Sequence, residues 1–137
     1  MAGSTCSSGA RAPYHAHVYF TGETRAAARE LHARLRRDIG ESGGLGVTYV
    51  GEMRDRGVGP HPLPQFEIHF VQADLPRVLH ALESSGLTVL VHPLTDDDLA
   101  DHTSLARWIG TPLELDLTVL DPPGANQGIA RFGKADV

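Results

Sequence analysis

Cysteine is almost absent from this chain. Its single cysteine, Cys6, lies in a stretch of glycine and serine, which excludes an internal disulfide and any cysteine-based metal motif. A chain of 137 residues with 41% hydrophobic content can bury a core without such cross-links, and this size indicates one domain. Because disulfides are also rare in reducing compartments, we expect a cytoplasmic protein.

Long apolar runs and basic stripes are missing as well. No run approaches the roughly 20 residues of a membrane-spanning helix, and residues 1–12 have no apolar stretch of the kind found in secretory signals. The formal net charge is −5, and no basic stripe follows any segment. We therefore expect neither a membrane nor a nucleic acid as partner. The sequence also has no glycine-rich phosphate loop and no nucleophile elbow.

Hydrophobic periodicity predicts alternating strands and helices between a disordered leader (1–12) and a loose tail (121–137). The single domain, 13–120, begins β-α-β-β-α-β, which is the order of the ferredoxin-like split βαβ fold. We therefore expect an α+β protein with an antiparallel sheet, two helices on one face, and an added C-terminal helix and strand. The expected strands are 15–20, 46–53, 66–72, 87–93 and 112–120, and the expected helices run from Thr21 or Thr24 to Gly43, from Asp74 to Gly86, and from Thr95 to Gly110.

Histidine is the residue type in excess, with eight in the chain. The segment YHAHVYF (14–20) has period two, so His15 and His17 project from one side, about 6.5 Å apart at Cα. The segment FEIHFVQ (66–72) places Glu67 and His69 together in the same way. In the ferredoxin-like topology these two strands are antiparallel neighbours at the sheet centre, with their apolar sides against the helices. All four side chains therefore share the face that the helices leave open.

The fourth strand extends this polar face. If Val89 and Val91 face the helices, His92 projects from the same side as the other strand histidines. Imidazole and carboxylate groups from neighbouring strands suit iron or zinc, and two histidines with one carboxylate suit an oxygen-activating Fe(II).

Simpler interpretations exist for the same residues. Each pair on its own can be polar strand surface or a cross-strand polar pair. His32 and His80, on the outer faces of predicted helices, are expected to be solvated. The convergence of both strand pairs on one face favours a functional site instead.

Four blocks of the sequence carry a family resemblance: YHAHVYF, GPHPLPQFEIHF, VHPLTDDDLADHT and WIGTPLELDL occur in this order between about residues 13 and 120. On these blocks the chain resembles the DOPA 4,5-dioxygenase-like family. The resemblance implies a ferredoxin-like fold and extradiol cleavage of a catechol such as DOPA by dioxygen, giving a muconic semialdehyde. It does not itself assign metal ligands, which follow from the shared face.

On that face we expect one Fe(II) ion per chain, with Zn(II) or Ni(II) as alternative occupants of an isolated sample. His17 and His69 are the expected first ligands, with His15 or Glu67 as the third. The candidates for acid–base catalysis or substrate binding are His61, His92 and His102, and those for a substrate carboxylate are Arg54, Arg56 and Arg107.

The expected partners are a small catechol, dioxygen and a second copy of the chain. An open sheet face with several histidines and Tyr19 is a poor bare surface, which favours a two-fold homodimer unless strand 112–120 covers the face. Two other function classes stay open: a non-catalytic metal-binding or ligand-sensing dimeric domain, and a cofactor-free α+β barrel enzyme. The clustered histidines disfavour the latter.

Overall fold

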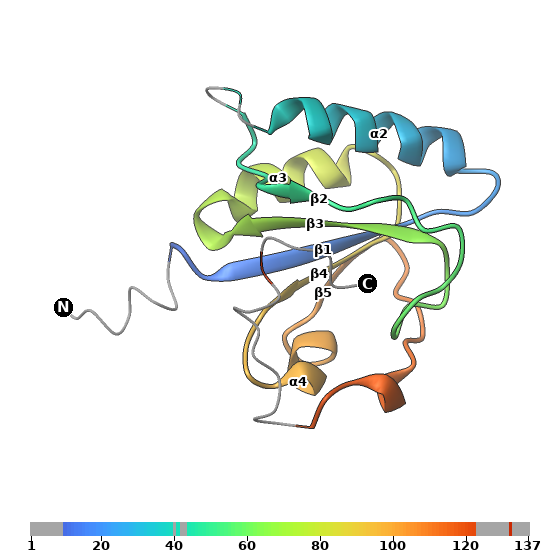
Figure 1. Cartoon of the computed structure of the whole chain (residues 1–137), viewed down its shortest axis with the longest axis vertical. Helices are drawn as coiled ribbons and strands as arrows, with labels where there is room; N and C mark the ends of the chain where they lie inside the picture. Colours follow the sequence, from blue (N-terminus) through green and yellow to red (C-terminus); the bar gives the residue numbers. More distant parts are fainter. Residues whose placement is uncertain (1–9, 40, 42–43, 123–131, 133–137) are drawn as a thin grey trace.

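The computed structural model describes residues 10–39, 41, 44–122 and 132. Its centre is an antiparallel five-stranded sheet in the order β2-β3-β1-β4-β5 (Figure 1). The strands are β1 (Pro13–Tyr19), β2 (Tyr49–Val50), β3 (Gln65–Val71), β4 (Val89–Pro93) and β5 (Arg107–Ile109), the helices are α2 (Arg25–Asp38), α3 (Leu75–Glu83) and α4 (Asp98–His102), and two 3-10 turns, η1 and η2, span Gln72–Asp74 and Leu117–Val119.

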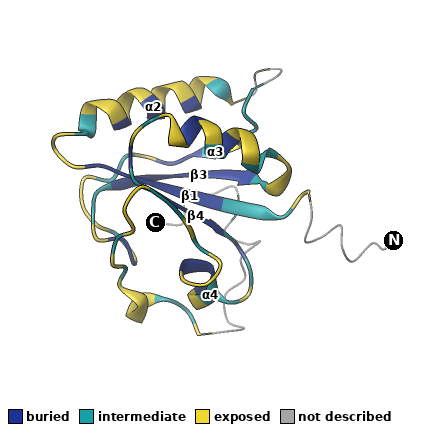
Figure 2. Cartoon of the chain, turned by 180° about the vertical axis from the view of Figure 1, so that it is seen from behind, coloured by how far each residue is buried: buried dark blue, intermediate teal, exposed yellow. Residues whose placement is uncertain are grey.

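Helices α2 and α3 lie on one face of the sheet, and α4 lies on the other side (Figure 1). The core fills the layer between the sheet and the first two helices because alternate residues of each strand are apolar on that side. In register, Val18 of β1 stands between Phe66 of β3 and Val89 of β4. Helices α2 and α3 contribute apolar residues spaced three or four positions apart to the same layer. Figure 2 shows that each of these two helices is buried on the side that meets the sheet and exposed on its outer side. The buried helix residues are Ala28, Leu31, Leu35, Val78, Ala81 and Leu82.

The ferredoxin-like arrangement predicted from the sequence is confirmed. Strands β1 and β3 are antiparallel neighbours in the middle of the sheet, and β4 flanks β1 on its other side. The added helix exists, but its predicted end was wrong, and the added strand is not the predicted segment 112–120. The third helix does not run from Thr95 to Gly110. It ends at His102, and the following residues, Arg107–Ile109, pair with β4 as a strand.

Local hydrogen bonds explain this difference. Asp97, rather than Thr95, caps α4 by accepting from the Ala100 amide, and the Leu105 amide turns back to bond the Ala100 carbonyl. The chain then reaches the edge of β4, whose unpaired backbone groups favour pairing with an extended segment. Because β5 occupies that edge, the alternating leucines of residues 112–120 form no strand. They follow an irregular path that ends in η2.

The second predicted strand, 46–53, is reduced to Tyr49–Val50, although pairing with β3 continues on both sides. The Gly51 amide bonds the Glu67 carbonyl, and Arg54 forms an isolated bridge with Gln65. The three residue steps from Gly51 to Arg54 therefore lie opposite the two steps from Glu67 to Gln65 on β3. This is the geometry of a β-bulge. A Cβ atom at Gly51 would lie 3.1 Å from the Glu67 side chain, so glycine leaves room for that carboxylate.

One of the two outer histidines departs from expectation. His80 is exposed as predicted. His32 is half-buried: its Nε2 donates to the Gly51 carbonyl at 2.8 Å, and its ring stands edge-on to Phe66. The prediction that His32 is solvated was wrong because the backbone of residue 51 passes over that side of α2.

The ends of the expected domain lie partly outside the described residues. Of the expected leader, residues 10 and 12 accept backbone hydrogen bonds from Ala73 and Gln72. Of the expected tail, the Asp121 amide bonds the Asp98 carboxylate. Residues 1–9, 123–131 and 133–137 are not among those described. Among the described helices, none has the length and apolar character needed to cross a bilayer.

The helix-facing core predicts a large stability loss on truncation. Ile68 is 0% exposed in the middle of β3, so Ile68→Ala should lower the free energy of unfolding by about 2–5 kcal/mol. Urea denaturation followed by circular dichroism measures this. Leu105→Ala is the control, because Leu105 is 49% exposed and should change the value by no more than about 0.5 kcal/mol. Equal effects of the two substitutions would contradict the assigned core.

Candidate metal centre

Six of the eight histidines are buried together on the sheet face that turns away from α2 and α3. The strand register explains why five polar positions meet there. His15 stands directly between His69 of β3 and His92 of β4, and His17 stands opposite Glu67. These side chains alternate with the core residues of the same strands, so one set of strands serves both faces. The buried polar residues of this cluster are His15, His17, His61, Gln65, Glu67, His69, His92 and His102.

The face expected to be open is covered by other segments of the same chain. The loop before β3 brings His61 over Tyr19, α4 brings His102 beside His92, and Trp108 of β5 stacks on Tyr19. The ring of Phe132 stacks on His69. The cover segments also bond one another, since the Asp116 amide donates to the Pro60 carbonyl. An uncovered face was the reason to expect a homodimer. The dimer stays a prediction, but this reason for it is weaker.

Two overlapping groups of three side chains place their ligand atoms within 4.8 Å of one another. One group is His15, His17 and His92, and the other is His15, Glu67 and His69. The two residues expected as first ligands, His17 and His69, thus fall into different groups, and His15 belongs to both. His92, expected as an acid–base residue, lies with His15 and His17.

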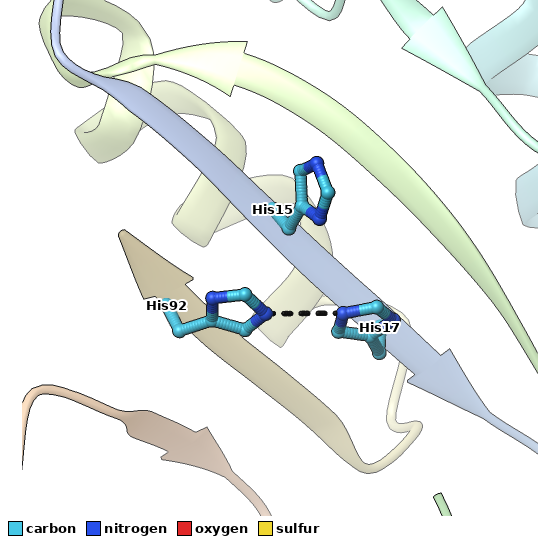
Figure 3. A group of neighbouring side chains, drawn as sticks. All are labelled: His15, His17 and His92. Carbon is cyan, nitrogen blue, oxygen red and sulfur yellow. Dashed lines mark hydrogen bonds between the residues drawn. The ribbon is translucent and has the colours of Figure 1, made fainter. Parts of the chain in front are cut away.

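The first group is shown in Figure 3, with His15 and His17 on β1 and His92 on β4. The Nε2 atoms of His17 and His92 lie 3.1 Å apart. The Nδ1 of His92 lies 2.8 Å from the Pro93 carbonyl, which can only accept, so His92 carries its proton on Nδ1. The Nδ1 of His17 lies 3.0 Å from Gln65 Oε1, which also accepts. If both rings are neutral, their Nε2 atoms carry no proton, and the two Nε2 lone pairs face each other.

Two lone pairs that face each other repel unless a proton or a cation lies between them. Burial lowers the pKa of His17 well below its ordinary value of 6.5, and His61 nearby acts in the same direction, which favours the neutral ring. A cation is therefore the better partner. Nitrogens bound at about 2.1 Å to one ion lie roughly 3.0–3.4 Å apart in octahedral or tetrahedral geometry, and the observed 3.1 Å separation agrees with this.

The second group has the carboxylate that suits Fe(II), but its rings are arranged differently. His15 and His69 stack within 10° of parallel, with centroids 3.8 Å apart. Lone pairs of stacked rings lie in separate parallel planes and do not converge on one ion. Glu67 Oε2 lies 2.5 Å from His69 Nε2 and 3.8 Å from His15 Nδ1. This arrangement suits a carboxylate that orients neighbouring imidazoles.

His61 and His102 approach the first group from the cover segments. The His61 ring lies 4.1 Å from that of His17, and its Nδ1 is 2.6 Å from the Tyr19 hydroxyl. Burial, followed by the nearby His102 and His92, lowers the pKa of His61 to about 3. Burial raises the pKa of Tyr19, which keeps its hydroxyl protonated. The Nδ1 of His102 donates to the Asp98 carbonyl at 2.8 Å, and its ring lies 4.4 Å from that of His92.

The structure brings all seven of the site histidines and carboxylates expected from the sequence into one buried cluster. The arginine candidates divide. Arg54 and Arg56 line a groove of about 540 Å³, and the Arg54 backbone forms a bridge with Gln65. Arg107 pairs with Val91 and so projects to the helix-covered side. Sequence reasoning missed Gln65, although its position two residues before Glu67 places it on the polar face.

The chemistry of these donors fits a transition metal. Three buried imidazoles supply nitrogen ligands. The Nδ1 atoms of His17 and His92 each have an oxygen acceptor, Gln65 and the Pro93 carbonyl, and the Glu67 carboxylate lies 3.8 Å from the Nδ1 of His15. Metal-bound histidines are commonly oriented by such acceptors. Fold and site together define a ferredoxin-like α+β domain with a histidine-rich centre that could hold a metal ion.

Comparison with known proteins places this domain more narrowly. Residues 14–119 match the Dopa 4,5-dioxygenase family, and the chain belongs to that family. It is 33% identical over 115 residues to the DOPA 4,5-dioxygenase of Amanita muscaria, covering 78% of this chain and 49% of that protein. It is 30% identical over 128 residues to an uncharacterized 21.2 kDa protein of Botryotinia fuckeliana, covering 82% and 66%. The chain thus spans less than two thirds of either curated relative.

A solved structure shares the fold. A Nostoc punctiforme protein described as "a putative dioxygenase" is 31% identical and superimposes with a TM-score of 0.70, covering 80% of this chain and 90% of that one. The family and the ferredoxin-like fold expected from the sequence are therefore both confirmed.

The lowered pKa values predict acid sensitivity of the metal-free protein. His17 and His61 bind protons more weakly when folded than at the ordinary value of 6.5, so unfolding takes up protons as the pH falls below about 6.5. The free energy of unfolding should then have its highest value above pH 7 and should fall steadily toward pH 5. Urea titrations in a chelator at pH 8, 6 and 5 measure this. A midpoint that does not move across this range would contradict neutral, buried histidines.

Proposed function

We propose that this chain is a non-haem Fe(II) extradiol dioxygenase that opens the ring of a catechol such as DOPA. Family membership and the name of the Amanita muscaria relative support an oxygenase of this type. The observation that carries the proposal is the pair of Nε2 atoms of His17 and His92, facing at 3.1 Å beside His15 with both Nδ1 atoms on oxygen acceptors.

We assign His15, His17 and His92 as the residues that would hold the ion. When bound, Fe(II) supplies a Lewis acid for the two catechol oxygens and a route for electrons from the ring to dioxygen. Three protein ligands leave further coordination positions for both reactants. The pair of Glu67 and His69 then serves as the support of His15, through the 3.8 Å contact of the carboxylate with Nδ1.

A catechol must lose protons as it binds, and the cover segments carry groups that can accept them. The Asp98 carboxylate lies 3.4 Å from His102 Nδ1, so it would stabilise the imidazolium formed when His102 takes a proton. His61 is held by the Tyr19 hydroxyl and is neutral near pH 7. We therefore assign His102 as the general base and His61 as a hydrogen-bonding group for the substrate.

The covered face also restricts water. Each of the six clustered histidines is no more than 8% exposed, so polar interactions within the centre are stronger than at a solvated surface. Arg54 and Arg56 line a groove together with Met53, Asp55 and Val58, and we propose that these guanidinium groups meet the carboxylate of a substrate such as DOPA.

Metal binding distinguishes the two candidate groups. The chain, once stripped of metal, should bind about one Fe(II) or Zn(II) ion per molecule. Anaerobic titration against a competing chelator measures this. His17→Ala and His92→Ala should each lower the affinity by more than about 100-fold, beyond the range of outer-shell changes. His69→Ala should lower it by at most about 100-fold, and His80→Ala, at an exposed position, should not change it.

The opposite order of metal affinities among these variants would favour the second group of candidate ligands. If His69→Ala abolishes binding and His92→Ala does not, the ligands are those of the second group, His15, Glu67 and His69. If every single variant keeps full occupancy, no ion is held by these histidines.

Turnover is the direct test of the enzymatic proposal. Iron-loaded protein should consume oxygen with at least one of DOPA, caffeate, protocatechuate and catechol, and form a yellow semialdehyde in equal amount. An oxygen electrode and visible absorbance measure the two quantities. His102→Ala should lower kcat by about 10²–10⁴-fold with metal content retained. Metal binding without oxygen uptake on any of these catechols would favour the non-catalytic, ligand-sensing alternative.

A further inference from the structure

We propose that Gln65 is a positioning residue that selects which nitrogen of His17 is available to the metal ion. The inference rests on the proposed function, because it takes His17 as a ligand. Gln65 is 0% exposed at the first position of β3, and its side chain reaches into the cluster from the side opposite His92.

Backbone hydrogen bonds on both sides of β3 fix the position of Gln65. Its amide donates to the Arg54 carbonyl at 3.1 Å, and its carbonyl accepts from the Arg54 amide at 2.9 Å. On its other side it pairs in register with Tyr19 of β1, two residues beyond His17. The position of the Gln65 side chain relative to His17 is therefore set by the sheet and not by a mobile loop.

The side chain of Gln65 has one hydrogen-bond partner among the described residues. Its Oε1 lies 3.0 Å from His17 Nδ1, whereas its Nε2 is buried and makes no hydrogen bond to any described residue. Leaving a buried amide nitrogen unpaired costs about 1–3 kcal/mol. The hydrogen bond of this side chain among the described residues is therefore the one in which its oxygen accepts from His17.

The acceptor at His17 Nδ1 differs in kind from those at His92 and His102. His92 and His102 have backbone carbonyls at Nδ1, which can never donate, so their proton positions are fixed. His17 depends on a side-chain amide alone. Without the Gln65 oxygen, the proton of His17 would be better placed on Nε2, where it can bond the His92 Nε2 at 3.1 Å. That tautomer removes the lone pair needed by the ion.

Two substitutions separate this role from simple packing. Gln65→Leu removes the acceptor and should lower Zn(II) affinity of the full chain by about 10–100-fold. Gln65→Glu keeps an acceptor and should retain at least the wild-type affinity. His32→Leu is the matched control, because it removes a partly buried side-chain hydrogen bond outside the cluster and should leave affinity unchanged. Gln65→Met replaces the leucine variant if urea denaturation shows that the latter is unfolded.

A spectroscopic measurement tests the same point without metal or turnover. In metal-free protein, ¹⁵N chemical shifts should report His17 with its proton on Nδ1, and Gln65→Leu should move that proton to Nε2. The same tautomer in both proteins, or equal Zn(II) affinity of Gln65→Leu and wild type, would overturn the inference. Zn(II) binding with the expected variant ranking but no catechol cleavage would leave the Gln65 role standing and remove only the dioxygenase activity.

Discussion

The register of β1 between β3 and β4 is the constraint on which the site depends. It sets His15 between His69 and His92 and at the same time sets Val18 between Phe66 and Val89. Because side chains alternate along a strand, a slip of one residue would turn the imidazoles into the helix-facing core and the apolar residues into the cluster. Both outcomes are costly, so the hydrophobic core itself fixes the geometry of the polar face.

Buried imidazole rings need hydrogen-bond partners at defined places. The fold supplies these partners from the ends of two strands and from helix α4. The Pro93 carbonyl follows His92 directly, the Asp98 carbonyl comes from the first residue of α4, and the Tyr19 hydroxyl comes from the end of β1. Each engages the Nδ1 of one imidazole: His92, His102 and His61, respectively. The Nε2 atoms of His17 and His92 then face each other, which is why this part of the cluster resembles a set of ligands more than a hydrogen-bonded core network.

The sequence predicted those parts of the fold that periodicity controls. Strand alternation around His15 and His69 gave the central pairing and the shared face, since the helices can cover only the apolar side. It did not predict where the chain goes after His102. That path depends on the free edge of β4 and on a cap at Asp97, neither of which changes the apolar spacing. Gln65 was missed because it precedes the predicted start of its strand at residue 66, although its spacing of two from Glu67 places it on the same face.

The covered face changes how the function of this domain should be understood. A histidine set on an open sheet would be a binding surface for a partner, with water as competitor at every ligand position. Here the loop with His61, helix α4 with His102, and Trp108 of β5 enclose the same set within one chain. Burial lowers the pKa of His17 and of His61, which favours their neutral rings, and the cover segments bring His61 and His102 within 4.1 Å and 4.4 Å, ring to ring, of His17 and His92. A simple metal-storage or dimer surface needs neither feature, whereas chemistry on a bound diol needs both.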